Sequence, residues 1–205
     1  METTFTFASK EELNAFISRL FAICTTLSVD VIRAISRRAQ SITDVKLPKN
    51  YVARHLIRNM LLSGVIYESS PHNYTIAGKK EDKSKHSLDC LWVFLQHMDG
   101  ANLLSLMKGP RPSSITYIKG NRIYHIVRCN DSGIAELGMA AQAEIDMNSR
   151  RRGGKADYVE ERFFFIFDSQ DAIDRAPFRL ESKTLFVLIS YEEGTRIPTF
   201  NYVSA

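Results

Sequence analysis

Five polar side chains, three of them Lys or Arg, occur at helical spacing in the first third of the chain. Asn50, Arg54 and Arg58 follow one another at intervals of four residues, with Lys49 and His55 beside them. Intervals of four place side chains on one face of an α-helix. The first 80 residues hold 11 Lys and Arg against 6 Asp and Glu, whereas the remaining residues hold 16 against 17. This local excess of positive charge indicates an acidic partner.

The element that must carry these side chains is a helix predicted over residues 49–62. Its apolar residues recur on the opposite face, which would point to the core: Val52, Ala53, Leu56, Ile57 and Met60. Pro48 suits the first turn of such a helix, and Gly64 suits its left-handed C-terminal cap.

Two helices and a hairpin are predicted around it. The capping box Ser9-Lys10-Glu11-Glu12 begins the first helix, and Ser28 can cap the second, with Thr25-Thr26-Leu27 as the break between them. After the third helix, two β-prone runs at 65–68 and 74–76 flank a Ser/Pro/Asn turn, which is typical of a hairpin.

Three helices followed by a hairpin over residues 9–78 resemble a winged helix-turn-helix domain. The residues that carry the resemblance are Tyr51–Leu56 and Met60–Tyr67, which look like a recognition helix running through a glycine into the wing. The resemblance implies that this helix enters the major groove of double-stranded DNA.

The resemblance also implies roles for single residues. Asn50 and Arg54 would meet base edges, and Arg58 or Lys49 a phosphate. The wing tip would approach the adjacent backbone or minor groove, so that the expected DNA-binding residues are Lys49, Asn50, Arg54, His55, Arg58, His72 and Asn73. Two alternatives remain open: a merely solvated helix face, and a winged helix that docks proteins without touching DNA.

The composition predicts a second domain after a charged linker. Residues 79–85 are polar, and 86–98 follow helical spacing, so 79–100 is expected to be a linker and a connector or dimer helix. Residues 101–205 are expected to form a mixed α/β sheet domain for oligomerisation or effector binding. The predicted fold class is therefore α+β, with an N-terminal winged helix and a C-terminal mixed sheet.

Within 101–205 the predicted elements alternate between strands and helices. A hairpin is expected over 115–127 and a helix over 132–146, with Ile134, Leu137, Ala141 and Ile145 on its inner face. The basic run 149–155 is expected to be a flexible loop that either is solvated or contacts DNA. Strands are expected at 162–167, 185–189 and 197–203, the first two joined by a short helix as a parallel crossover.

One pattern in this half could support catalysis. Glu181-Ser182-Lys183 has the Glu-x-Lys spacing found in metal-dependent nucleases, and Asp168 lies upstream after a strand. A carboxylate there would bind Mg²⁺ while Lys183 supports an attacking water. The pattern departs from that family, because Glu181 and Lys183 precede the apolar strand. An ordinary charged entry to a strand is the alternative.

Other chemistry is not indicated. The sequence contains no phosphate-binding loop and no dinucleotide fingerprint, so we expect no enzyme activity, no cofactor and no metal. Cys24, Cys90 and Cys129 are scattered and are expected to be reduced, packed thiols. No run of about 20 apolar residues is present, so we expect a cytoplasmic protein without a membrane partner.

The whole-chain layout also resembles small bacterial replication-relaxation-like proteins of plasmids and conjugative elements. The residues that carry this resemblance are Arg54–Tyr67 and Arg162–Asp168. It implies regulation or initiation on mobile DNA, with no activity attached. We therefore expect a DNA-binding regulator of transcription or of plasmid or mobile-element replication. One copy of the domain offers few base contacts, so we expect a homodimer.

Overall fold

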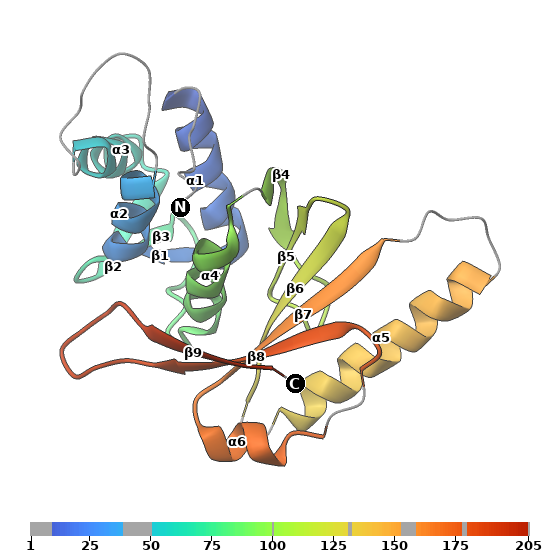
Figure 1. The fold of residues 1–205 in the computed structure, drawn as a ribbon. Coiled ribbons are helices and arrows are strands. Elements are labelled where there is room, and N and C mark those ends of the chain that lie inside the picture. The colour runs from blue at the N-terminus through green and yellow to red at the C-terminus, as the bar shows by residue number, and fades with distance from the viewer. Residues whose placement is uncertain are drawn as a thin grey trace. The chain divides into compact units, whose positions relative to one another are not determined.

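The computed structural model describes residues 10–38, 51–99, 101–130, 133–152, 159–177 and 180–204. It is an α+β structure, as predicted (Figure 1). The chain divides into a first unit, residues 1–100, and a second unit, residues 101–205. Among the described residues, no helix is both long enough and apolar enough to cross a membrane.

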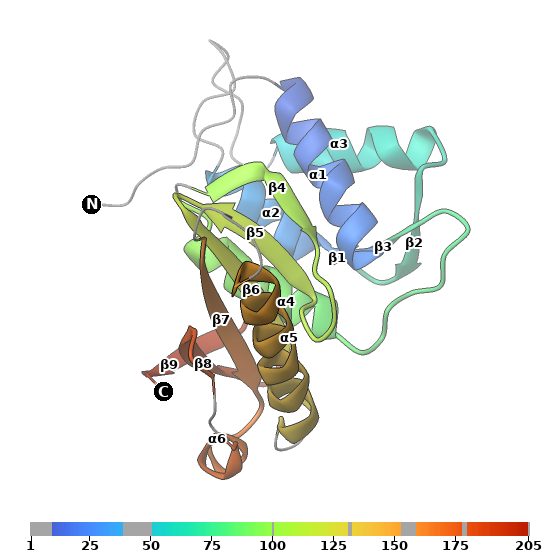
Figure 2. The same ribbon diagram turned by 90° about the vertical axis from the view of Figure 1, so that its right-hand side faces the viewer.

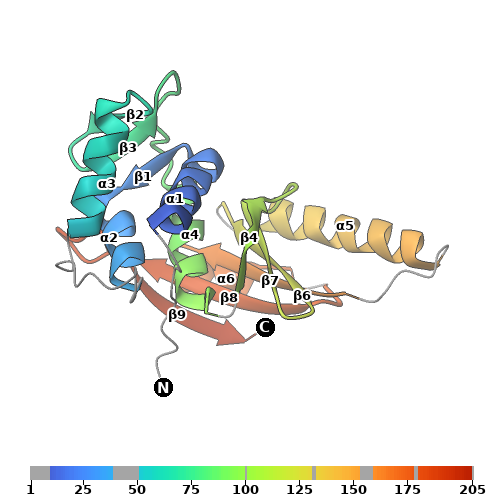
Figure 3. The same cartoon turned by 90° about the horizontal axis from the view of Figure 1, so that it is seen from above.

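In its described residues, the first unit combines four helices with a three-stranded antiparallel sheet of order β1-β3-β2 (Figure 3). Its elements are α1 (Lys10–Cys24), β1 (Thr26–Ser28), α2 (Val29–Arg38), α3 (Tyr51–Leu62), β2 (Ile66–Ser70), β3 (Asn73–Ile76) and α4 (His86–His97). The predicted hairpin is confirmed as β2 and β3. The predicted break at 25–27 is confirmed, because α1 ends at Cys24, but the pairing of Thr26–Ser28 with β3 as a strand was not predicted.

Polar side chains join the three strands of this sheet. The hydroxyls of Thr26 and Thr75 lie 2.9 Å apart across β1 and β3, and Thr75 donates to Ser69 Oγ of β2 at 2.8 Å. At the end of β1, Ser28 Oγ accepts from the N–H of Val31 at 3.3 Å, which confirms Ser28 as the cap of α2. The helices close over the sheet with buried side chains that include Leu13, Ile17, Leu20, Ile32 and Ile35.

The charged segment 79–85, predicted to be a linker, is hydrogen-bonded to the small sheet. The N–H of Asp82 donates to Thr26 Oγ1 at 3.0 Å, and the carboxylate of Glu81 accepts from Ser70 Oγ at 2.6 Å. The following helix α4 packs on α1, where the rings of Phe94 and Phe16 lie 6.5 Å apart. Helix α4 therefore belongs to the first unit.

The second unit is built on a six-stranded sheet whose strands follow the chain in order. The elements are β4 (Ala101–Lys108), β5 (Ile115–Lys119), β6 (Arg122–Arg128), α5 (Ile134–Arg152), β7 (Glu160–Phe167), α6 (Gln170–Arg175), β8 (Lys183–Ser190) and β9 (Thr199–Ser204). Strands β6, β7 and β8 are parallel, and the outer pairs are antiparallel, so the predicted mixed sheet is confirmed. Strand β4 was not predicted.

Helices α5 and α6 cross from one parallel strand to the next and share one core (Figure 2). Alternate residues of β7 point into this core, so that Phe163, Phe165 and Phe167 pack with α5, α6 and Phe186 of β8. The three cysteines are buried and form no disulfide, and Cys129 lies in this same cluster.

Helix α5 differs from its prediction in length and in orientation. It continues through Arg152, so part of the basic run expected to be a loop is helical. Leu137 and Ala140 face the core, whereas Ile134 and Ile145 are exposed. Glu144 is buried because its carboxylate accepts the N–H groups of Glu181 and Ser182 at 3.0 and 2.9 Å. This tie fixes which face of α5 turns inward.

Two glycines of the second unit have similar left-handed backbone conformations but differ in how closely they are packed. Gly120 and Gly133 have φ values of +58° and +66°, where an L side chain costs about 1 kcal/mol. A Cβ at Gly120 would meet nothing within 4 Å, whereas one at Gly133 would lie 2.8 Å from Phe167 Cε1. We expect Gly120→Ala to lower the free energy of unfolding by about 1 kcal/mol and Gly133→Ala by about 2–4 kcal/mol, measured by urea denaturation. Equal costs would contradict this packing.

Candidate functional site

Helix α3 presents the predicted cationic face to solvent. Leu56, Ile57 and Met60 are buried, and Arg54, His55 and Arg58 are exposed on the other side of the helix. Lys49 and Asn50 lie outside the described residues. The prediction of an amphipathic helix is therefore confirmed over the part that the structure describes, with two arginines four residues apart on the open face.

The end of α3 is fixed by the predicted glycine cap. Gly64 has a φ of +68°, and the N–H of Val65 donates to the carbonyl of Met60 at 3.0 Å. The N–H of Gly64 donates to the carbonyl of Leu61 at 3.1 Å. This pattern of bonds ends the helix and directs the chain into β2.

The turn between β2 and β3 is short and is attached to the rest of the first unit. His72 is exposed at its tip, but its carbonyl accepts from the N–H of Val29 at 2.8 Å. The amide Nδ2 of Asn73 donates to Ser70 Oγ at 2.9 Å and to Glu81 Oε1 at 3.3 Å. The Asn73 amide thus bonds within the unit and beside a carboxylate, so His72 alone of this pair presents its side chain outward.

The three nuclease candidates lie at opposite ends of the parallel strands. Lys183 is the first residue of β8 and pairs with Arg162, whereas Asp168 follows the last residue of β7. Six residues along a strand correspond to roughly 20 Å. Asp168 also binds the guanidinium of Arg128. The structure therefore does not bring Asp168 together with Glu181 and Lys183, and no group of three metal-ligating side chains occurs in the part of the chain that the structure describes.

A buried polar cluster that the sequence did not indicate joins β5, β6 and β7. The Nδ1 atom of His125 lies 3.2 Å from Ser113 Oγ and 3.3 Å from Thr116 Oγ1. On the other side of the ring, Nε2 lies 3.5 Å from Glu161 Oε2. Serine, histidine and a carboxylate in sequence could perform acyl transfer if the serine were accessible. Ser113 is only 6% exposed, with Gly109 packed against it, so its hydroxyl is not accessible from solvent in this structure.

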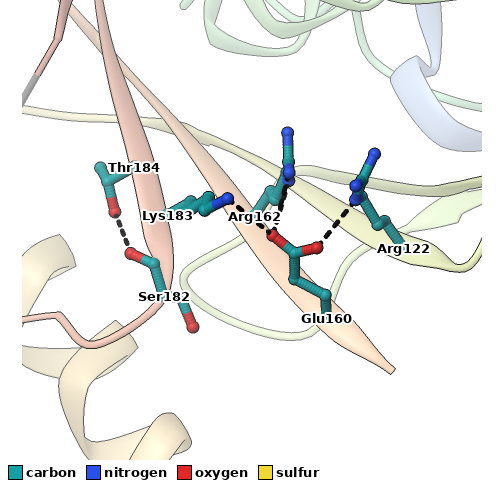
Figure 4. Close-up of polar contacts among 6 residues, drawn as sticks. All are labelled: Arg122, Glu160, Arg162, Ser182, Lys183 and Thr184. Carbon is teal, nitrogen blue, oxygen red and sulfur yellow. Dashed lines mark hydrogen bonds and ion pairs between the residues drawn. The ribbon is translucent and has the colours of Figure 1, made fainter. Parts of the chain in front are cut away.

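An exposed cationic cluster occupies the amino ends of the parallel strands (Figure 4). Glu160 Oε2 accepts from Arg122 Nε at 2.8 Å, and Glu160 Oε1 accepts from Arg162 Nη2 at 2.9 Å. Lys183 Nζ lies 3.7 Å from the same carboxylate. We call these four residues the strand-start cluster, because Arg122, Glu160 and Lys183 each begin a strand.

The interaction between Glu160 and Arg122 shifts the pKa values of both groups. Hydrogen bonds from Arg122 and Arg162 lower the pKa of the Glu160 carboxyl below its ordinary value, and the bond to Glu160 raises the pKa of Arg122. Sequence reasoning missed the cluster because its members are up to 61 positions apart. The one signal it could have used is that charged residues begin three consecutive strands.

Comparisons of this chain with protein-family models, with curated proteins and with solved structures give no match. The two exposed cationic surfaces are therefore the features of the molecule from which its function is inferred.

The lowered pKa of Glu160 predicts a pH dependence of stability. A carboxyl whose pKa is depressed by folding stabilises the protein above its ordinary pKa of 4.5, and this stabilisation is lost as the pH falls through the lower folded value. We expect Glu160→Gln to remove part of the loss of melting temperature between pH 5 and 3. The control Glu193→Gln, at an exposed position, should retain the wild-type profile. Parallel profiles for all three proteins would contradict the ion pairing.

Proposed function

We propose that the first unit is a winged helix-turn-helix domain that binds double-stranded DNA through α3. The observation that carries the proposal is the two-sided character of this helix. Burial of Leu56, Ile57 and Met60 holds the exposed Arg54 and Arg58 toward solvent on a rigid element. A helix of this kind can lie in the major groove, where arginine recognises guanine through two hydrogen bonds.

The order of elements supports this proposal. Helices α1, α2 and α3 are followed directly by the β2–β3 hairpin, which takes the place of the wing. The short strand β1 pairs with β3 and so ties the hairpin to the segment between α1 and α2. The hairpin is thereby held in a defined place beside the end of α3, as a wing must be if it is to reach the DNA backbone.

Phosphate contacts would supply most of the affinity and Arg54 the base contact. Each phosphate that a cation neutralises releases condensed counterions, which makes the binding strongly dependent on salt. The wing would contribute less than the resemblance implies, because Glu68 and Glu81 lie near its turn and bond to its residues. The proposed interface therefore centres on α3, with Lys49 and Asn50 preceding it in sequence.

The process served would be regulation of transcription or of replication on a bacterial plasmid or other mobile element, in the cytoplasm. A homodimer would place two copies of α3 on a two-fold symmetric site and double the number of base contacts. The function proposed is binding without catalysis.

Charge reversal on α3 tests the proposal. We expect Arg54→Glu/Arg58→Glu to weaken binding to a labelled duplex of about 30 base pairs by at least about 100-fold at low salt, measured by fluorescence anisotropy. The slope of log Kobs against log salt should also become shallower by about 1, because Arg58 is the phosphate-facing cation that this variant loses.

The matched control changes the same charge at another place in the first unit. Lys80 and Lys83 are exposed in the segment 79–85, so Lys80→Glu/Lys83→Glu alters the net charge equally without altering α3. Equal loss of binding in both double variants would show a general effect of charge and would contradict recognition by α3.

A protein-docking role is the second candidate, and exposed apolar side chains at the end of α3 favour it. Leu62 is 76% exposed and Val65 49% exposed, with Leu61 and Tyr67 beside them in sequence and also exposed. Apolar side chains of this size are common in protein interfaces. Under this candidate the α3 charge variant would retain its partner, and the wild-type protein would not bind the duplex even at low salt.

A further inference from the structure

We propose that the strand-start cluster of the second unit is a second nucleic-acid site, which binds the phosphate backbone. The inference that these phosphates belong to a nucleic acid rests on the DNA binding proposed for the first unit. The cluster itself is defined by its own geometry, which is independent of α3.

The cluster contains more positively charged than negatively charged side chains. Arg122, Arg162 and Lys183 converge on the single carboxylate of Glu160 (Figure 4), so three cations meet one anion. The carboxylate holds the two guanidinium groups in place through bonds of 2.8 and 2.9 Å. Less conformational entropy is therefore lost when a phosphate binds, and two positive charges remain uncompensated within the cluster.

The cations are accessible in the way that phosphate binding needs. The side chain of Lys183 is 74% exposed and that of Arg122 46% exposed. Arg122 bonds to Glu160 through Nε, and its side chain also forms a hydrogen bond with Tyr124. Guanidinium groups match phosphate oxygens in geometry and remain charged at any physiological pH.

One neighbouring residue extends the positive surface. Lys119 pairs with Arg122 across the β5–β6 turn. The next carboxyl along β7, Glu161, is buried beside His125. Glu144 is likewise buried, bonded to backbone N–H groups. Glu181 is the exposed carboxylate that precedes β8.

The spread of the cations favours a polyanion over a single small anion. Arg122, Arg162 and Lys183 stand on three adjacent strands, which span roughly 10 Å because neighbouring strands are about 4.8 Å apart. A row of this width matches the repeated phosphates of a nucleic-acid strand. The contacts would be independent of sequence, as is usual for phosphate contacts.

The test compares two double charge reversals in the full-length protein. Arg122→Glu/Lys183→Glu changes the strand-start cluster and keeps Glu160 and Arg162. The control Lys108→Glu/Arg175→Glu changes two exposed cations at the other end of the sheet by the same net charge. We expect the cluster variant to make the salt slope for a 30-base-pair duplex shallower by about 2 and to weaken binding more than 10-fold at low salt. The control should remain within about twofold of wild type.

The outcomes separate this inference from the proposed function. If the α3 variant loses binding while the cluster variant matches its control, the second site is refuted and the first-unit proposal stands. If the cluster variant loses binding while the α3 variant does not, the first-unit proposal fails and the second site stands. If the cluster variant binds the duplex as its control does but loses the binding of inorganic phosphate that the wild type shows, the site binds free phosphate and the inference is overturned. Circular dichroism of each variant verifies that it is folded.

Discussion

The parallel register of β6, β7 and β8 is the constraint on which the chemistry of the second unit depends. Pairing of Arg122 with Glu160 and of Arg162 with Lys183 places the beginnings of three strands at one end of the sheet. The same register sends Asp168 to the other end. One set of backbone hydrogen bonds thus builds a cationic cluster and separates Asp168 from Lys183. A shift by one residue would turn every side chain to the opposite face, so the Phe-rich core also fixes this arrangement.

An equivalent constraint acts in the first unit through burial. Leu56, Ile57 and Met60 must be removed from water, and the helical period then leaves Arg54 and Arg58 outside. The glycine cap at Gly64 ends the helix shortly after these residues. In both units, therefore, apolar packing determines where positive charge is displayed. Both surfaces would gain binding free energy in the same way, by the release of counterions from phosphates.

Local patterns predicted the elements that have a local cause. The amphipathic period predicted α3, and Ser28 predicted the start of α2. The alternation on both sides of Gly120 predicted the β5–β6 hairpin. Elements defined by distant partners were missed: β1 is three residues long and exists because it pairs with β3, and β4 is an edge strand without clean alternation. The inner face of α5 was misassigned because Glu144, a carboxylate, is buried through bonds to the backbone near residue 181. The strand-start cluster depends on pairing between residues 122, 160 and 183, which no short window contains.

The most direct test of the account is the salt dependence of duplex binding by the wild-type protein. Fluorescence anisotropy with a random duplex of about 30 base pairs should give a dissociation constant of roughly 10⁻⁴ to 10⁻⁶ M, with log Kobs falling linearly against log salt at a slope steeper than about −3. That slope would require several cations at phosphates, more than α3 supplies from Arg54 and Arg58 alone. Absence of binding at low salt, or binding that does not change with salt, would contradict the claim that this chain binds nucleic acid through its cationic surfaces.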